Sequence, residues 1–265
     1  MPILETDALG RCFGKLRAVD SLTLSVEAGE VFGLLGPNGA GKTTVIKMLT
    51  TLLPPTSGRG RVDGLDIVRR PADVRRIIGY VPQMLSADGT LNGYENLLVF
   101  AKLYELPRSE RKTCVRDALQ LMGLTDAADR LVRTYSGGMI RRLEIAQSML
   151  HAPRVLFLDE PTIGLDPVSR QAVWERITQL RVEYGTTILL TTHYMEEADA
   201  LCTRVGIMHL GTLRAVGTQA ELKATVGGEG ATLEQVFVHY AGASAESGGS
   251  YRETFRTRRT ARRLG

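Results

Sequence analysis

Short runs without charged residues, with apolar residues at their centres, divide the chain and predict the strands of a buried sheet. Val31–Leu35 runs up to a glycine, and residues 155–158 and 186–192 repeat the same pattern. A strand exposed on one face alternates apolar and polar residues, so continuous runs indicate strands covered on both faces, as in a parallel sheet. Farther along, residues 205–208 and 212–216 flank a glycine turn and are typical of a hairpin.

Other segments place apolar residues three and four positions apart, which is the period of a helix. They are residues 94–103 and 113–122, separated by Pro107, and a segment after Ser136, a residue type that caps helices well. The apolar side expected of this last helix consists of Ile140, Leu143, Ala146, Met149 and Leu150. We expect these helices to form a helical subdomain at about residues 84–150, inserted into an α/β domain with a mostly parallel sheet.

The composition suits one large α/β domain or a main domain with a small attached lobe. The chain has 265 residues, of which 43% are hydrophobic. Cys12, Cys114 and Cys202 lie far apart without a CxxC pair, which favours reduced thiols in a cytosolic protein over disulfides or a metal site. No apolar run approaches the roughly 18 residues of a membrane helix, and the N-terminus lacks a secretion-signal pattern. We therefore expect another chain to form any membrane pathway that this protein serves.

Positive charge is concentrated near the end of the chain. The net charge is +4, and residues 252–263 hold six arginines against one acid, Glu253. The stretch before them, residues 241–250, is rich in Gly, Ser and Ala, as flexible linkers are. We expect a folded domain over residues 1–241 and a solvated linker and arginine tail over 242–265, with a weak contact to anionic lipid or a partner left open. Nucleic acid is not an expected partner, because the body of the chain is not basic.

Positions 36 to 43 fit the phosphate-loop pattern GxxxxGK[ST] without a mismatch. Its glycines let backbone N–H groups turn onto phosphates, and the helix that follows adds partial positive charge. We predict that Lys42 reaches the β- and γ-phosphates of ATP, that Thr43 binds Mg²⁺, and that Thr44 donates near the α-phosphate. The packing side of the following helix holds Val45, Ile46, Met48 and Leu49. The predicted ATP-binding residues of the loop are Gly36, Pro37, Asn38, Gly39, Ala40, Gly41, Lys42, Thr43 and Thr44.

Two acids, Asp159 and Glu160, end the apolar run at 155–158. Carboxylates beside a buried strand are unfavourable unless they meet a cation or a catalytic water. The pair therefore predicts a site for Mg²⁺ and for hydrolysis.

A second anion-binding turn is predicted at Ser136-Gly137-Gly138, where a helix begins. The phosphate loop already cradles a nucleotide in the same chain. The second turn has a use if it meets ATP held by another subunit, which predicts a dimer with shared sites.

The order of the phosphate loop, the Ser-Gly-Gly turn and the Asp-Glu strand resembles the ATP-binding subunit of ABC transporters, over residues 4–241. The resemblance implies a phosphate-loop NTPase fold with an antiparallel N-terminal β part. It implies that Asp159 holds Mg²⁺, that Glu160 is the general base for the attacking water, and that His193 contacts the γ-phosphate. It further implies that Gln83 senses Mg²⁺ and water, and that the loop with Asp166 crosses the dimer interface.

Phe13 stands where the family usually has an aromatic residue that stacks on adenine. A buried core phenylalanine is the alternative, because phenylalanine is commonly buried.

The motif Tyr135-Ser-Gly-Gly-Met139 narrows the resemblance to the daunorubicin/doxorubicin-resistance type of ATP-binding subunit. Residues 211–217 and 233–238 also match this type. The resemblance implies a homodimer, a separate ABC-2 type permease, ATP and Mg²⁺ as cofactors, and a peripheral place on the cytoplasmic face of the membrane. Met139 replaces the commoner glutamine, so any hydrogen bond of that amide is absent.

The expected function is ATP hydrolysis that powers export of a drug-like or antibiotic compound. Export of a lipid or polysaccharide stays open, because the ATPase does not touch the cargo. A soluble ATPase acting on ribosomes or DNA is the alternative from another class, and the single domain and compact helical subdomain speak against it.

Overall fold

The computed structural model describes residues 2–227 and 230–242. The predicted linker and arginine tail, 242–265, lies outside the described residues apart from its first position. The division into an ATPase domain and a tail therefore stays a prediction.

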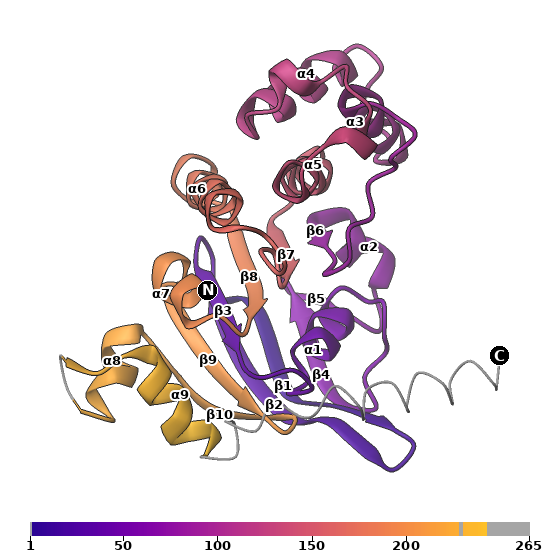
Figure 1. Cartoon of the computed structure of the whole chain (residues 1–265). Coiled ribbons are helices and arrows are strands. Elements are labelled where there is room, and N and C mark those ends of the chain that lie inside the picture. The colour runs from indigo at the N-terminus through magenta and orange to yellow at the C-terminus, as the bar shows by residue number, and fades with distance from the viewer. Residues whose placement is uncertain (1, 228–229, 243–265) are drawn as a thin grey trace, which may run out of the picture.

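The described part of the chain forms two sheets and a set of surrounding helices (Figure 1). The strands are β1 (Pro2–Phe13), β2 (Leu16–Glu27), β3 (Val31–Leu35), β4 (Ser57–Val62), β5 (Leu65–Asp66), β6 (Ile78–Val81), β7 (Val155–Asp159), β8 (Thr187–Thr192), β9 (Arg204–His209) and β10 (Thr212–Gly217). The helices are α1 (Lys42–Leu49), α2 (Pro71–Ile77), α3 (Gly93–Leu103), α4 (Arg111–Leu121), η1 (Thr125–Ala127), η2 (Val132–Thr134), α5 (Gly137–Met149), α6 (Pro167–Tyr184), α7 (Met195–Leu201), α8 (Gln219–Ala224) and α9 (Leu233–Ala241).

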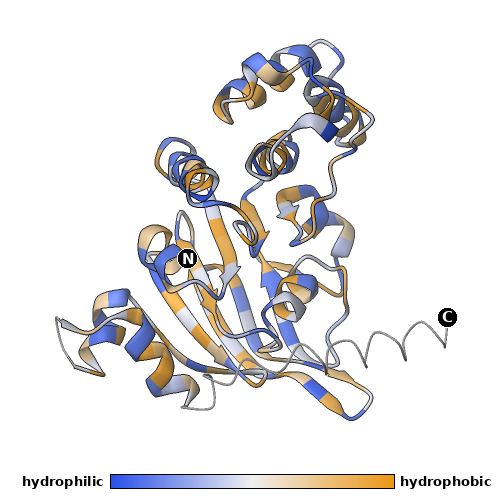
Figure 2. Ribbon diagram, in the orientation of Figure 1, coloured by the Kyte–Doolittle hydropathy of each residue, from blue (hydrophilic) through white to orange (hydrophobic). Residues whose placement is uncertain are grey.

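The larger sheet has the order β10-β9-β3-β8-β7-β6, in which all strands except the edge strand β10 pair in parallel. Its strands are buried on both faces: Val155 and Phe157 of β7 pack into one apolar cluster, whereas Leu156 and Leu158 pack into the other. Figure 2 shows long hydrophobic segments along these strands. The predicted buried strands, the mostly parallel sheet and the β9–β10 hairpin are confirmed.

The smaller sheet, of order β2-β1-β4-β5, is antiparallel and comes largely from the N-terminal part of the chain. Its apolar face shares a core with α1 and with one face of the larger sheet, as at Leu22, Val26, Ile46 and Phe157. This packing brings Ala18 and Val19, near the start of β2, against the loop that precedes α1, where the predicted nucleotide site begins. The antiparallel N-terminal β part implied by the resemblance is confirmed.

The chain leaves the sheet after β6 and returns at β7, and α3, α4 and α5 lie between, at one end of the molecule (Figure 1). Helix α3 begins with a capping box, in which Asn92 accepts from the Glu95 N–H and Glu95 accepts from the Asn92 N–H. The helices predicted at 94–103 and 113–122 are present with slightly different ends. Their apolar residues join the same core as α5 and α6.

Helix α5 packs its predicted apolar side against the core, and it is buried on more sides than the sequence suggested. Leu143, Ala146 and Leu150 are buried as expected, while Ile140 and Met149 are partly exposed. The helix runs between the sheet, α3 and α6, so it is covered on several sides. The buried residues of α5 therefore include polar ones, which are Arg141, Glu144, Gln147 and Ser148.

Candidate nucleotide-binding active site

Three neighbouring strands of the larger sheet bring the predicted catalytic residues to one edge. The phosphate loop follows β3, His193 follows β8, and Asp159 and Glu160 stand at the end of β7. The strands pair in the order β3-β8-β7 and run parallel, so their carboxyl ends meet. Ligands of open α/β sheets bind at such carboxyl ends.

Two glycines of the phosphate loop have no room for a side chain. A Cβ at Gly36 would lie 2.5 Å from the Met208 carbonyl oxygen. Gly41 has a φ of 101°, and a Cβ there would lie 2.5 Å from the Ala18 carbonyl oxygen. The loop is also tied to the sheet, because the Gly36 N–H donates to the Thr192 carbonyl oxygen at 3.2 Å. The packing thus keeps the loop close against β2 and β9.

Helix α1 begins inside the phosphate loop, so Lys42, Thr43 and Thr44 form its first turn. Its N-cap residue, Gly41, supplies no side-chain hydrogen bond. The first N–H groups of a helix lack intrahelical partners and favour an anion. Among the loop residues, Asn38 and Gly39 are exposed at the tip, while Ala40 is buried.

The ammonium group of Lys42 is buried among oxygen atoms. Its Nζ donates to the carbonyl oxygens of Gly36 at 2.7 Å and Pro37 at 3.2 Å. It also lies 3.0 Å from Oε1 of Glu160. A buried charge needs such partners. The structure therefore brings the lysine of the phosphate loop and the carboxylate at the end of β7 into direct contact.

Thr43 and Asp159 come together as a pair of oxygen ligands. Thr43 Oγ1 donates to Asp159 Oδ1 at 3.0 Å, and the Thr191 hydroxyl donates to the same oxygen at 2.6 Å. Mg²⁺ prefers hydroxyl, carboxylate, phosphate and water oxygens. The donor set at the end of β7 fits this cation.

Glu160 is held in an uncommon backbone conformation. Its φ is 51°, in the left-handed region that non-glycine residues seldom adopt. Two hydrogen bonds fix it there, because its N–H donates to the Thr191 carbonyl oxygen at 3.1 Å and to the Thr191 hydroxyl at 3.0 Å. Strained residues that the fold holds in place concentrate at functional sites.

The Glu160 carboxylate is shared between two cationic or polar groups. Oε2 lies 2.5 Å from Nδ1 of His193, and Oε1 faces Lys42. Burial by itself raises the pKa of Glu160, but the hydrogen bond with His193 and the charge of Lys42 outweigh it, so the pKa is lower than usual. The carboxylate is thus ionised at neutral pH.

The Ser-Gly-Gly turn and Asp166 lie together at the start of two helices. Ser136 is exposed and accepts from the Met139 N–H at 3.3 Å, which caps α5. Asp166 accepts from the Ser169 N–H at 2.9 Å, which caps α6, and hydrogen bonds from the Ser169 side chain and then from this N–H lower the Asp166 pKa. A Cβ at Gly138 would lie 2.7 Å from Cβ of Ser169, so the two helix starts touch.

These predicted interface residues are separate from the predicted catalytic residues. Over residues 2–227 and 230–242, the hydrogen bonds of Ser136 and Asp166 stay within their own helix starts, and neither reaches Lys42 or Glu160. Gly137 contacts Leu165 rather than the phosphate loop. A role at a nucleotide therefore requires a ligand outside the Lys42–Glu160 cluster.

The side chains of Gln83 and Phe13 are both exposed. Phe13 is 45% exposed at the end of β1, and the Arg11 guanidinium lies over its ring at 4.8 Å from the centroid. The alternative of a buried core phenylalanine is therefore wrong. Gln83 takes part through its backbone, since its carbonyl oxygen accepts from Arg141 at 2.8 Å. Contacts of either residue with a nucleotide stay predictions.

Several residues at the site were not expected from the sequence. Thr191 orients both acids, yet it stands inside an apolar run and looks like an ordinary strand residue. Glu197 is buried and accepts from Thr162 at 2.6 Å and from Trp174 at 3.0 Å, beside the Asp-Glu strand. An acid on a short helix gives no signal of burial. Arg141 lies on a helix for which the sequence predicted one apolar side, so a charged residue there would be assigned to the solvent-exposed face.

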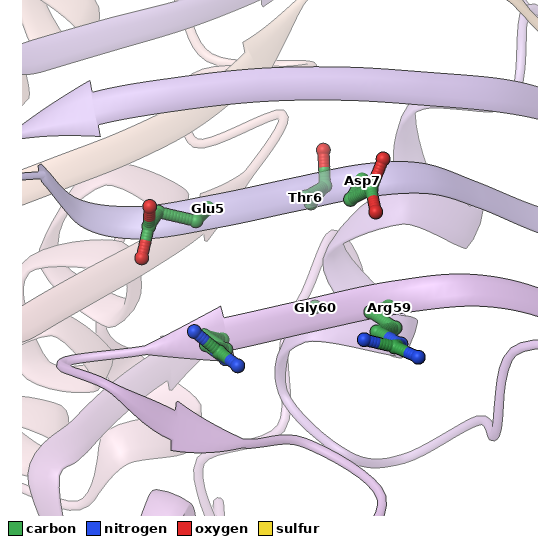
Figure 3. Close-up of a pocket in the computed structure, with 6 residues that line it drawn as sticks. Glu5, Thr6, Asp7, Arg59 and Gly60 are labelled. Atoms are coloured by element: carbon green, nitrogen blue, oxygen red, sulfur yellow. The ribbon is translucent and has the colours of Figure 1, made fainter.

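A pocket of about 200 Å³ lies elsewhere, on β1 and β4 (Figure 3). Across these strands Glu5 pairs with Arg61, and Asp7 with Arg59, so acids face bases. The pocket holds none of the predicted ATP-binding residues. Its lining residues are Glu5, Thr6, Asp7, Arg59, Gly60 and Arg61.

The geometry defines a class of protein: a nucleotide-hydrolysing enzyme of the phosphate-loop type, with a lysine cradle, an oxygen pair suited to Mg²⁺ and a buried carboxylate. Residues 19–163 match the family model described as ABC transporter. The chain therefore belongs to the ABC transporter family.

Individual relatives show which members of the family this chain resembles. The daunorubicin/doxorubicin resistance ATP-binding protein DrrA of Streptomyces peucetius is 48% identical over 224 residues, which cover 84% of this chain and 68% of that protein. The linearmycin resistance ATP-binding protein LnrL of Bacillus subtilis (strain 168) is 41% identical over 227 residues, 86% of this chain and 73% of that protein. A solved structure of an ATP-binding subunit of an ABC transporter superposes with a TM-score of 0.80 at 29% identity, covering 91% of this chain and all of the other.

These likenesses confirm the predicted family, fold and enzymatic activity. The chain is an ATP-binding and ATP-hydrolysing subunit of an ABC transporter, and it works with membrane components. Among the residues that the structure describes, no helix has the length and apolar character needed to span a membrane.

Proposed function

We propose that this chain powers the export of a drug-like or antibiotic compound through a separate ABC-2 type permease. It acts as a pair of identical subunits on the cytoplasmic face of the membrane, with residues 1–241 as the ATPase domain. The observation that carries the hydrolytic part is the contact of Glu160 with both Lys42 and His193 at the carboxyl edge of the sheet. The resistance functions named for the relatives support the kind of cargo.

The phosphate loop and its neighbours bind Mg-ATP. Lys42 neutralises charge on the β- and γ-phosphates, and the first N–H groups of α1 donate to them. Thr43 and Asp159 would hold Mg²⁺, and the exposed Gln83 would respond to it. When bound, Mg²⁺ neutralises charge that develops on the phosphate oxygens. Phe13 stacks on adenine from the end of β1.

Glu160 orients the attacking water and accepts its proton. Its low pKa keeps it ionised, and its strained backbone and two hydrogen bonds to Thr191 fix its position. His193 holds the carboxylate through Nδ1 and turns toward the γ-phosphate. A positioned general base contributes roughly 10²–10⁴-fold to the rate.

A second subunit completes each site. The exposed Ser136 hydroxyl and the Gly137–Gly138 helix start face the ATP of the partner, and Asp166 crosses the same interface. Their separation from the Lys42–Glu160 cluster of their own chain supports this arrangement.

The permease docks on the segment 86–97 and on the two exposed apolar residues directly before it. Met84 is 81% exposed and Leu85 is 47% exposed, directly after Gln83. Exposed apolar side chains of this kind suit a protein interface. A movement of the docked permease therefore displaces Gln83.

The test is to capture the Glu160→Gln chain from detergent-solubilised membranes of its native cells with Mg-ATP, followed by mass spectrometry. Recovery of a multi-span permease supports the proposal. Recovery of ribosomal or DNA-associated proteins without a membrane subunit refutes it. Cells lacking the captured permease are then challenged with a panel of antibiotics, and unchanged susceptibility to all of them points to a lipid or polysaccharide cargo instead.

A further inference from the structure

Helix α5 carries buried polar side chains on the side that faces the loop after β6. Arg141, Glu144 and Gln147 stand three residues apart, so each lies next to the following one on the helix surface. The side chains of Arg141 and Glu144 are each 2% exposed. We call them the α5 polar stripe, and we call residues 82–88 the Gln83 loop.

Arg141 joins α5 to the beginning of the Gln83 loop. Its Nη1 donates to the Pro82 carbonyl oxygen at 2.6 Å, and its Nη2 donates to the Gln83 carbonyl oxygen at 2.8 Å. Nη1 also lies 3.0 Å from Oε2 of Glu144. The planar guanidinium can serve two neighbouring carbonyls at once, which a lysine ammonium cannot do with the same geometry.

Glu144 joins the same helix to the middle of the loop. Its Oε1 accepts hydrogen bonds from the backbone N–H of Ser86 and from the Ser86 hydroxyl, the latter at 3.1 Å. The loop is therefore fixed on both sides of Met84 and Leu85, which point outward as exposed apolar residues.

The end of the loop is held in the same way through α3. The Asp88 N–H donates to Asn96 Oδ1 at 3.0 Å, and Asn96 Nδ2 donates to the Asp88 carbonyl oxygen at 2.9 Å. Gln147 Nε2 donates to Asn96 Oδ1 at 3.4 Å. The contacts run from Pro82 to Asp88, and each ends on α5 or on a residue bonded to α5.

Stability alone is a poor reason for this arrangement. Burial lowers the pKa of Arg141 and raises the pKa of Glu144, which reports that both ions lose hydration. Replacing a buried ion pair by apolar residues of similar volume is often neutral or stabilising. The ion pair here does what apolar residues cannot do, since it fixes three backbone groups of one loop in place.

The stripe also starts close to the Ser-Gly-Gly turn. Arg141 is one helical turn beyond Gly138, on the rigid helix that Ser136 caps. Gln83 and the Ser136–Gly138 turn are therefore both held by helix α5.

We propose that Arg141 and Glu144 are positioning residues that make the Gln83 loop and the Ser136–Gly138 turn move as one unit. This inference rests on the proposed function, in which Gln83 responds to the Mg²⁺ of its own subunit and Ser136 meets the ATP of the partner. The pair transmits a displacement of the docked permease at Met84 and Leu85 to the Ser136–Gly138 turn at the partner's nucleotide.

The first test replaces Arg141 by methionine, which keeps volume and removes the bonds to Pro82 and Gln83. We expect kcat for ATP to fall by about 10- to 100-fold, because misplacement of about 1 Å near a reacting group reduces rates by up to about 10²-fold. The Kd of a non-hydrolysable ATP analogue should change by less than about threefold, because the phosphate loop is untouched. Arg142→Met is the matched control: Arg142 bonds the carbonyl oxygens of Met122 and Gly123, inside the helical subdomain. It should keep kcat within about twofold.

Hydrogen exchange gives a readout that a general loss of stability does not produce. The Ser86 amide is protected by Glu144, so Glu144→Met should speed its exchange about tenfold or more while the amides of β7 and β8 are unaffected. Glu144→Gln keeps an acceptor for that amide and should retain most of the protection. The comparison of Glu144→Met with Glu144→Gln tests the proposal even if Arg141→Met does not fold.

Two results would overturn the inference. One is a folded Arg141→Met chain with wild-type kcat; the other is unchanged exchange of the Ser86 amide in Glu144→Met. Both leave the proposed function intact when Lys42→Ala still abolishes turnover. Failure of Lys42→Ala to do so would instead contradict the proposed function itself.

Discussion

The Glu160→Gln substitution tests the catalytic cluster most directly. It removes one negative charge from between Lys42 Nζ, 3.0 Å away, and His193 Nδ1, 2.5 Å away. Glutamine keeps the length of the side chain and one carbonyl oxygen, but it cannot accept a proton from water. If Glu160 is the general base, the loss is roughly 10²–10⁴-fold in kcat, or about 3–5 kcal/mol in the activation free energy.

Folding should be affected much less. The attraction between Lys42 and Glu160 at this distance is about 5 kcal/mol at an effective dielectric constant of about 20, but the desolvation of both ions offsets much of it. Lys42 also keeps its bonds to Gly36 and Pro37. We expect a loss of about 1–3 kcal/mol in the free energy of unfolding, so the variant should remain folded at 25 °C.

The assay compares ATP turnover at saturating Mg-ATP with the oligomeric state on size-exclusion chromatography. The variant should bind ATP, stall, and elute as an ATP-dependent dimer. Glu196→Gln is the matched control, because Glu196 is an exposed carboxylate of α7 that pairs with Arg170 at 3.6 Å. It should retain wild-type turnover. A Glu160→Gln chain with more than about one tenth of wild-type kcat would refute the general-base role.

Other predictions test the cradle, the helix contact, the core and the pH response. Lys42→Ala should abolish turnover, because it removes the ammonium group held beneath the phosphate loop; a standard phosphate-release assay with substantial residual activity would contradict that role. Gly138→Ala places a Cβ 2.7 Å from Cβ of Ser169, so it should push α5 from α6 and reduce turnover at least about tenfold, whereas wild-type activity would show that the helices yield freely. Phe157→Ala removes a fully buried ring from β7 and should lower the free energy of unfolding by about 3–5 kcal/mol in urea denaturation; a loss below about 1 kcal/mol would contradict the packing. The pKa of Glu160 is lower in the folded state than its ordinary 4.5, so its stabilising contribution is present above that value and is lost as the pH falls through the folded pKa. Thermal melting of Glu160→Gln should accordingly depend less on pH in the acid range than melting of the wild type, and identical pH profiles would argue against the shift.

The strands and the phosphate loop were predictable because local pattern and tertiary environment agree. Residues 155–158 are apolar throughout, and the fold buries β7 on both faces. The phosphate-loop pattern requires glycine at positions 36 and 41, and the structure has carbonyl oxygens where a Cβ would be. At such positions the residue type in the sequence already indicates the structural requirement.

Other features depend on contacts between distant segments, which periodicity does not reveal. Thr191 gave no signal, since its role comes from the neighbouring strand β7, 32 residues away from it at Asp159. The exposed place of Phe13 depends on how far the β1–β2 hairpin extends beyond the core. The ion pair between Lys42 and Glu160 likewise depends on the order of strands in the sheet rather than on either motif alone.

Helix α5 shows the same limit and gives it a physical meaning. Its apolar positions predicted a helix with one packing side. The charged residues between them would ordinarily be placed on the solvent-exposed face. The structure buries Arg141 and Glu144 because a polar loop, rather than solvent, covers that side of the helix. A backbone loop that is itself short of hydrogen-bond partners needs charged side chains opposite it. An arginine and a glutamate three residues apart on a helix otherwise rich in core residues therefore indicate a second segment packed against that helix, and in this chain that segment carries Gln83.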